Sequence, residues 1–174
     1  WETNCIEDWE TKVSEITKET TKKDMAVIGG IPPWVQMYFE ALKKASNKET
    51  VSEIFPNFNL FVYGGVNFEP YKKTFHELIG KKIDSIEYYP ASEGFFAYQD
   101  SQKSKGLLLQ LNSGIYYEFI ELEDMKNSSP IRHNVGSVRI GPNYVLVISS
   151  SAGLWAYNTG DTVAFVSLSP HKII

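Results

Sequence analysis

Hydrophobic residues in the first half of the chain fall alternately at helical spacing and in short continuous runs. Trp9, Val13 and Ile16 recur every three to four residues through a charged stretch, which predicts an amphipathic helix. Pro32-Pro33 predicts the start of a second helix, because proline is best tolerated in the first helical turn. Strands separated by glycine turns and helices predict βαβ units with parallel pairing. A further helix is expected over residues 69–79, and strands are expected over residues 25–28, 59–63 and 83–89.

The pattern changes after Glu93, where strand-like runs follow one another with only short polar turns between them. Turn sequences such as Asn112-Ser113-Gly114 and Asn158-Thr159-Gly160-Asp161 separate these runs, which predicts antiparallel pairing. We therefore expect a single domain of the α/β class, with a βαβ-type portion at residues 1–93 and a mainly antiparallel β portion at residues 94–174. The strand-like runs are 94–98, 107–111, 115–122, 144–149, 154–157 and 162–168.

Composition and charge narrow the class of protein. The 174 residues are 43% hydrophobic and 22% charged, as in a folded globular domain. The 17 basic residues are outnumbered by 21 acidic ones and form no basic block, which argues against nucleic acid as a partner. Cys5 is the only cysteine, so an internal disulfide and a thiolate metal cluster are both excluded. No apolar run reaches the roughly 18 residues of a transmembrane helix, and we expect a cytoplasmic protein without a membrane partner.

Two segments at predicted strand ends carry residues suited to binding a nucleotide. Glycines in Tyr63-Gly64-Gly65-Val66 let the backbone approach a ligand closely, although by itself the segment is more simply explained as a tight turn between strand and helix. The segment Tyr88-Tyr89-Pro90-Ala91-Ser92-Glu93-Gly94 offers a ring, a hydroxyl and a carboxylate. These groups suit an adenine face, a phosphate oxygen and Mg²⁺, which commonly takes only one or two protein carboxylates. A proline turn with a polar cap is the alternative reading.

A third segment, Tyr157-Asn158-Thr159-Gly160-Asp161, places an aspartate at the tip of a predicted hairpin. Such a carboxylate can accept hydrogen bonds from both ribose hydroxyls, and bonds to charged groups are among the stronger ones in proteins. Ordinary turn chemistry explains the same residues, because asparagine, glycine and aspartate all favour turns.

Taken in order, these segments resemble the adenylate-forming enzymes and, within them, the bacterial branch of the auxin-responsive acyl-acid amido synthetase family. One shared motif stands as Tyr89-Pro90-Ala91-Ser92-Glu93, continued by Gly94-Phe95-Phe96-Ala97. Another stands as Gly153-Leu154-Trp155-Ala156-Tyr157-Asn158-Thr159-Gly160-Asp161. The Gly64-Gly65-Val66 segment, the Pro-Pro-Trp helix entry and Ile115-Tyr116-Tyr117-Glu118-Phe119 also look like this branch. The resemblance extends from about Trp9 onward.

The resemblance implies an activity and a set of residue roles. The family uses ATP and Mg²⁺ to convert a carboxylic acid into an acyl-adenylate, and then passes the acyl group to an amine, commonly an amino acid. The backbone at Gly64, Gly65 and Val66 would line the adenine and acyl pocket. The segment Tyr89-Pro90-Ala91-Ser92 would contact the nucleotide, with Tyr89 stacked on adenine. Ser92 would contact the α-phosphate or the substrate carboxylate, Glu93 would hold Mg²⁺, and Asp161 would bind the ribose hydroxyls.

Departures from the family pattern limit what this chain is expected to do alone. Asn158 stands where the family usually carries arginine or lysine, and no counterpart of the family's phosphate loop or C-terminal domain occurs. We therefore expect an internal fragment of a longer enzyme, with an ATP affinity no better than about millimolar and no turnover. A sheet cut from its neighbouring strands leaves an unpaired edge, which predicts self-association. The alternatives are a non-catalytic module for binding or interaction, and transfer of the acyl group to coenzyme A.

Overall fold

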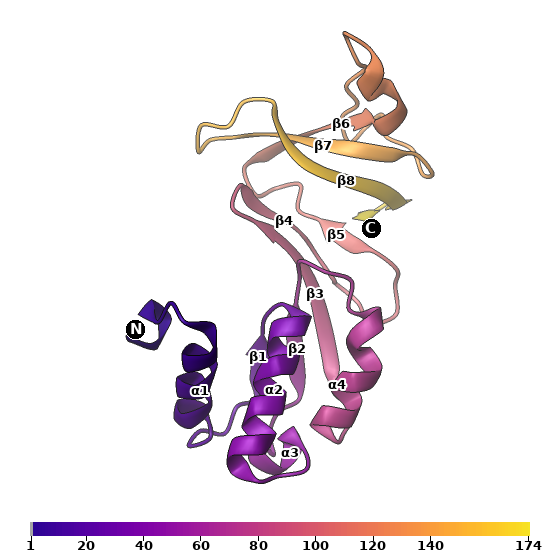
Figure 1. Ribbon diagram of the computed structural model, residues 1–174. Helices are drawn as coiled ribbons and strands as arrows, with labels where there is room; N and C mark the ends of the chain where they lie inside the picture. Colours follow the sequence, from indigo (N-terminus) through magenta and orange to yellow (C-terminus); the bar gives the residue numbers. More distant parts are fainter. Residues whose placement is uncertain (1) are drawn as a thin grey trace. The chain divides into compact units, whose positions relative to one another are not determined.

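The structure is a computed structural model that describes residues 2–174, and the chain divides into two compact units. Unit 1 is Trp1–Ile86 and unit 2 is Glu87–Ile174. Helices predominate in unit 1, and unit 2 consists mainly of strands (Figure 1). The predicted α/β class is confirmed. A single domain whose character changes at residue 94 stays a prediction. No helix among residues 2–174 is long and apolar enough to cross a membrane.

Unit 1 contains a parallel pair of strands joined through helices. Strand β1 pairs in parallel with β2, with Val27 opposite Leu60, which confirms the predicted parallel pairing of these two strands. Helix α2 begins at Pro32 as predicted. The predicted helix over 69–79 begins as a 3₁₀ turn and becomes α-helical at Lys72. The elements are η1 (Glu2–Cys5), α1 (Trp9–Thr20), β1 (Val27–Gly29), α2 (Pro32–Ser46), α3 (Val51–Ile54), β2 (Leu60–Tyr63), η2 (Glu69–Tyr71) and α4 (Lys72–Ile79).

An aromatic cluster forms the core of unit 1. Phe75 of α4 packs against Phe39 of α2 and against Phe61 of β2, with ring centroids 5.5 and 4.9 Å apart. Phe58 and Phe68 extend the cluster, and all five rings are buried. Burial of each large ring stabilises the unit by about 1.5–3 kcal/mol. Helices α2, α3 and α4 and strands β1 and β2 therefore share one core.

Unit 2 is an antiparallel sheet in the strand order β3-β4-β5-β9-β8-β7-β6, which confirms the antiparallel pairing predicted for the second half. Strand β3 begins in unit 1 and runs into unit 2. Phe96, Phe119 and Phe165 lie in its core with Tyr144. The elements are β3 (Asp84–Ala91), β4 (Gly94–Tyr98), β5 (Leu107–Leu109), β6 (Ile115–Glu121), η3 (Leu122–Lys126), β7 (Asn143–Ser150), β8 (Tyr157–Leu168) and β9 (His171–Ile173).

Four sequence predictions in unit 2 are wrong. The strand predicted over 154–157 is absent apart from Tyr157, where β8 begins. The turn predicted at Asn158–Asp161 lies inside β8, and the strand predicted to end at Tyr89 continues through Pro90 to Ala91. The pairing register shifts between Tyr89 and Pro90, and such an irregularity tolerates a residue that lacks a backbone N–H. Strand β9 was not predicted, because three residues are too few for a period-2 pattern.

Candidate functional site

Glu93 lies in the tight turn of a hairpin formed by β3 and β4, which we call the Glu93 hairpin (Tyr88–Tyr98). Ala91 pairs with Gly94, so Ser92 and Glu93 alone make the connection. Ser92 is exposed, whereas Glu93 is half-buried. A side chain at position 94 would meet the Ile115 side chain at 2.6 Å, so glycine lets the hairpin lie close to β6. The carboxyl end of β3 therefore presents a hydroxyl and a carboxylate side by side.

Asp161 lies in an irregular stretch of β8, which we call the Asp161 bulge (Asn158–Thr162). Val145 pairs with Thr162 and Val147 pairs with Asn158, so three residues of β8 stand opposite Leu146 alone. Gly160 has φ +83°, a left-handed conformation that glycine adopts without a steric penalty. Two extra residues are thus accommodated without interrupting the strand.

Side chains of the Asp161 bulge stabilise it from within. The Asn158 Oδ1 accepts a hydrogen bond from the backbone N–H of Gly160 at 2.9 Å. Thr159 Oγ1 donates to the Leu146 carbonyl at 3.1 Å and accepts from the Asp161 N–H at 3.2 Å. These Asx- and ST-type bonds replace ladder bonds that the extra residues cannot make. These bonds fix the backbone at Asp161. Asn158 therefore stabilises the bulge, at the position where the family that the sequence resembles usually has arginine or lysine.

Two tyrosine hydroxyls join the hairpin to the bulge. Tyr89 Oη donates to Asp161 Oδ2, and Tyr157 Oη donates to Glu93 Oε1 at 3.3 Å. Residues separated by 72 and 64 positions in the sequence are brought together in this way. The structure thus brings Tyr89, Glu93 and Asp161 into one exposed site, which we call the Glu93–Asp161 site.

The Glu93–Asp161 site is acidic. Burial raises the pKa of Tyr89 far above its usual range, and the hydrogen bond to Asp161 and the charges of Asp161 and Glu93 raise it further. The phenol therefore stays protonated and remains a donor at neutral pH. No lysine or arginine among residues 2–174 forms an ion pair with Glu93 or Asp161. Two carboxylates without a basic partner favour ligands that bring cations or hydroxyl donors.

The donor set fits Mg²⁺ that arrives with a phosphate. Glu93 supplies one carboxylate, and its Oε1 accepts from Tyr157. No group of three or more histidine, cysteine, aspartate or glutamate side chains in the described chain could hold a metal ion by itself. Mg²⁺ often takes one protein carboxylate and completes its octahedron with phosphate oxygens and water. Glu93 therefore suits a nucleotide-bound ion better than an all-protein metal site.

The remaining residues predicted for the site have different surroundings. The Tyr89 ring is half-buried and packs edge-on against Phe96, with centroids 5.1 Å apart, and Pro90 is exposed. Ala91 is the last residue of β3. Gly64, Gly65 and Val66 follow β2 in unit 1, where Gly65 adopts φ +83°. Their part in a common site with Glu93 and Asp161 stays a prediction.

The sequence alone does not identify the hydrogen bonds of two side chains, Tyr157 and Thr159. The first belongs to a motif and the second to a predicted turn. The signal that could identify them is the even spacing of Tyr157, Thr159 and Asp161, because alternate residues of a strand share a face. The bulge disturbs that alternation, so the pattern alone does not assign the contacts.

Comparisons with known proteins agree with the motifs. Residues 108–173 match the GH3 family central domain, a region that includes all of β8 and Asp161. The chain is also 30% identical over 120 residues to jasmonoyl--L-amino acid synthetase JAR4 of Nicotiana attenuata. Residues 108–173 of the chain are therefore similar to the GH3 family central domain. The alignment takes in 65% of this chain and 20% of JAR4, so this chain spans about a fifth of the length of that curated relative.

Solved structures share this chain's fold at low sequence identity. GH3.15 acyl acid amido synthetase has a TM-score of 0.68 and 13% identity, over 98% of this chain and 40% of that one. A 2-hydroxyisobutyryl-CoA ligase has a TM-score of 0.63 and 14% identity, over 93% and 37% of the two chains. The Vibrio cholerae adenylation domain AlmE has a TM-score of 0.56 and 12% identity, over 96% and 34%. The chain therefore shares its fold with part of each of these three proteins.

Proposed function

We propose that this chain is the part of an ATP-dependent acyl-acid amido synthetase of the GH3 family that contacts the adenosine and the reacting phosphate. The match of residues 108–173 to the GH3 central domain, the similarity to JAR4 and the fold shared with GH3.15 acyl acid amido synthetase support the reaction class. The observation that carries the proposal is the pair of hydrogen bonds that unites Glu93 and Asp161 in one site. One nucleotide can reach both carboxylates only if they lie close together, because Asp161 would bind its ribose and Glu93 would bind the Mg²⁺ on its phosphates.

Each group of the Glu93–Asp161 site has a proposed task. Asp161 accepts hydrogen bonds from the ribose hydroxyls, since it is exposed and held by the bulge. Tyr89 contributes a ring for adenine, and its hydroxyl keeps the Asp161 carboxylate oriented. Ser92 is exposed beside Glu93 and donates its hydroxyl to the α-phosphate or to the substrate carboxylate. Glu93 holds Mg²⁺, and Tyr157 orients the Glu93 carboxylate.

The proposed reaction has two steps. A carboxylate oxygen of the acid attacks the α-phosphorus of ATP, and the bond to pyrophosphate breaks. The amine of an amino acid then attacks the acyl carbon, AMP leaves, and the amine loses a proton as the amide forms. Bound Mg²⁺ supplies charge neutralisation at the phosphates. The chain's own contribution is positioning, because hydrogen bonds at Asp161 and Ser92 hold the nucleotide in line with the acid. We place this ATP-dependent reaction in the cytoplasm.

Nucleotide binding by this chain tests the proposal. We expect ATP with Mg²⁺ to bind with a Kd near millimolar in ligand-observed NMR, since few contacts, most of them exposed, hold the nucleotide. Asp161→Ala removes two acceptors for ribose and should raise that Kd about tenfold. Glu123→Ala removes the same charge from an exposed position in η3 and serves as the control. Equal effects of both variants, or no binding of ATP at any concentration up to its solubility, would contradict the proposal.

A second measurement separates an enzyme from a non-catalytic module. A longer protein that contains this chain should release pyrophosphate when given ATP and its acid, and Glu93→Gln should reduce that release and raise the Mg²⁺ concentration needed. Nucleotide binding without any pyrophosphate release would favour the binding module. Product analysis with an amino acid and with coenzyme A then identifies the acceptor.

A further inference from the structure

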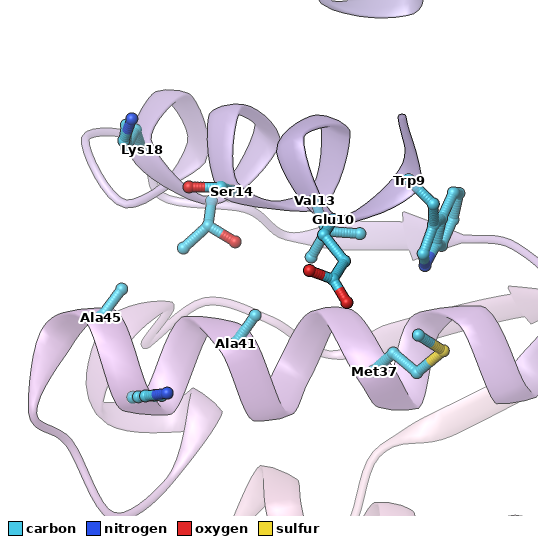
Figure 2. Close-up of a pocket in the computed structure, with 10 residues that line it drawn as sticks. Trp9, Glu10, Val13, Ser14, Lys18, Met37, Ala41 and Ala45 are labelled. Carbon is cyan, nitrogen blue, oxygen red and sulfur yellow. The ribbon is translucent and has the colours of Figure 1, made fainter. Parts of the chain in front are cut away.

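A groove between α1 and α2 in unit 1 lies outside the proposed adenylation site. Its volume is about 540 Å³. Figure 2 shows the two helices running in the same direction along it, with Trp9, Glu10 and Met37 toward one end and Lys18 and Ala45 toward the other. Val13, Ser14 and Ala41 lie between these ends. The small side chains of α2 and Ser14 of α1 leave the middle of the groove open.

The surface around this groove is unusually apolar for exposed helices. Trp34 is 54% exposed, Met37 is 46% exposed and Trp9 is 38% exposed. The rings of Trp9 and Trp34 lie 5.6 Å apart, so the two helices present a joint aromatic face. Tryptophan and methionine are enriched in the centres of protein–protein interfaces and depleted from free surfaces. This face has the composition of an interface with another protein.

Helix α1 contributes little to the buried part of unit 1, and Thr17 illustrates this. It is the one buried side chain of α1, and its exposed fraction is 2%. Its Oγ1 has no hydrogen-bond partner among the described residues. α1 therefore contributes little apolar burial to unit 1 by itself, although its Trp9 and Val13 are available to pack against something else.

Charges at the two ends of the groove select the kind of partner. Glu10 is at the beginning of α1, and Lys44 lies next to Ala45 near the end of α2. Both are exposed, and neither forms an ion pair within the described chain. A partner that fits must carry a cation at the Glu10 end, an anion at the Lys44 end and apolar side chains between them. A second copy of the same groove, rotated end over end, presents this pattern of charges.

We propose that two copies of this chain associate through the α1–α2 groove as an antiparallel two-fold pair. A two-fold axis perpendicular to the groove reverses its direction, so Glu10 of each copy faces Lys44 of the other. Such an interface is isologous, and every contact in it occurs twice. Met37 of each copy then lies near Ala45 of the other copy, and the open middles of the two grooves face each other. A two-fold axis along the groove would instead put Glu10 against Glu10, and charge repulsion disfavours that arrangement.

Charge exchange tests this arrangement directly. Sedimentation of the wild-type chain over about 10–500 μM should show a reversible shift from 19.8 kDa toward twice that mass. Glu10→Lys or Lys44→Glu alone turns two attractive contacts into two repulsive ones and should weaken association about tenfold or more. An equimolar mixture of the two variants restores opposite charges at both contacts, so the mixed pair should associate as the wild type does.

Two controls make the outcome decisive. Lys48→Glu changes the same charge at an exposed residue beyond α2 and should leave association unchanged. Ala41→Glu places a carboxylate in the apolar middle and should abolish the pair while the circular dichroism spectrum stays native. A wild-type chain that is monomeric throughout overturns the proposal. Association that none of the groove variants changes also overturns it, and would favour pairing through a sheet edge. Failure of the mixture to associate excludes the antiparallel arrangement.

Discussion

Substitution of Gly160 tests whether the Asp161 bulge is what positions the candidate site. Gly160 adopts φ +83°, and a Cβ built there meets no atom within 4 Å. Gly160→Ala therefore introduces no clash, and its cost is the left-handed backbone alone, about 1–2 kcal/mol for a residue with a side chain. In a chain of this length, that loss lowers the melting temperature by about 2–8 °C. Thermal unfolding measures the fall in melting temperature, and urea unfolding measures the loss of stability.

Gly114 provides a matched control for this experiment. It lies in the turn before β6, has φ +78°, and a Cβ there also meets nothing within 4 Å. Gly114→Ala should therefore cost about the same free energy of unfolding as Gly160→Ala. Only Gly160→Ala should weaken ATP binding, because relief of its strain moves Asp161 away from Tyr89.

Two results would refute this reasoning. A Gly160→Ala variant as stable as the wild type would mean that residue 160 is not left-handed in solution. An equal fall in ATP affinity for both alanine variants would mean that the affinity follows general stability rather than the position of Asp161. NMR titration with ATP and Mg²⁺ distinguishes these outcomes, because it measures weak binding and folding in the same sample.

The remaining predictions concern the core, the ion pair of a buried lysine with an exposed aspartate, and the reaction. Phe119→Ala removes a fully buried ring that packs against Phe165 at 5.0 Å, and should lower the free energy of unfolding by about 3–5 kcal/mol in urea titrations. The hydrogen bond from buried Lys172, at 2.5 Å, holds the pKa of Asp100 below its usual range. That stabilisation is present above the ordinary aspartate pKa and is lost as pH falls through the lowered one, so Lys172→Met should flatten the decline in stability below about pH 4. In a longer protein that contains this chain, Asp161→Ala should slow pyrophosphate release at an unchanged circular dichroism spectrum, and an unchanged rate would remove Asp161 from the site.

Most helices and strands could be predicted from the sequence, because the hydrophobic period and the turn or cap residues of each one agree with the way it packs. Pro32-Pro33 begins α2, and the apolar positions of α2 include Leu42, which is buried in the core. Strand β4 occupies the predicted residues 94–98. In each case the hydrophobic period and the neighbouring turn or cap residues point to the same structure. The ends of these elements could therefore be placed closely.

The candidate site could be predicted only in part, because long-range contacts override its local signals. Asn158, Thr159 and Gly160 have strong turn propensity, yet β7 holds them in a strand and their side chains form the bulge. The order of the motifs along the chain identifies Ser92, Glu93 and Asp161 as candidate site residues. Their meeting depends on the tyrosine hydroxyls of Tyr89 and Tyr157, which no pattern along the chain identifies.

Strand β9 gives three residues a disproportionate effect on the sheet of unit 2. His171–Ile173 pairs with β5 on one side and with β8 on the other. β5 belongs to the same meander as the Glu93 hairpin, and β8 carries Asp161. A version of the chain shortened before residue 171 would therefore divide the sheet between the two halves of the candidate site, even though every side chain assigned to that site would still be present.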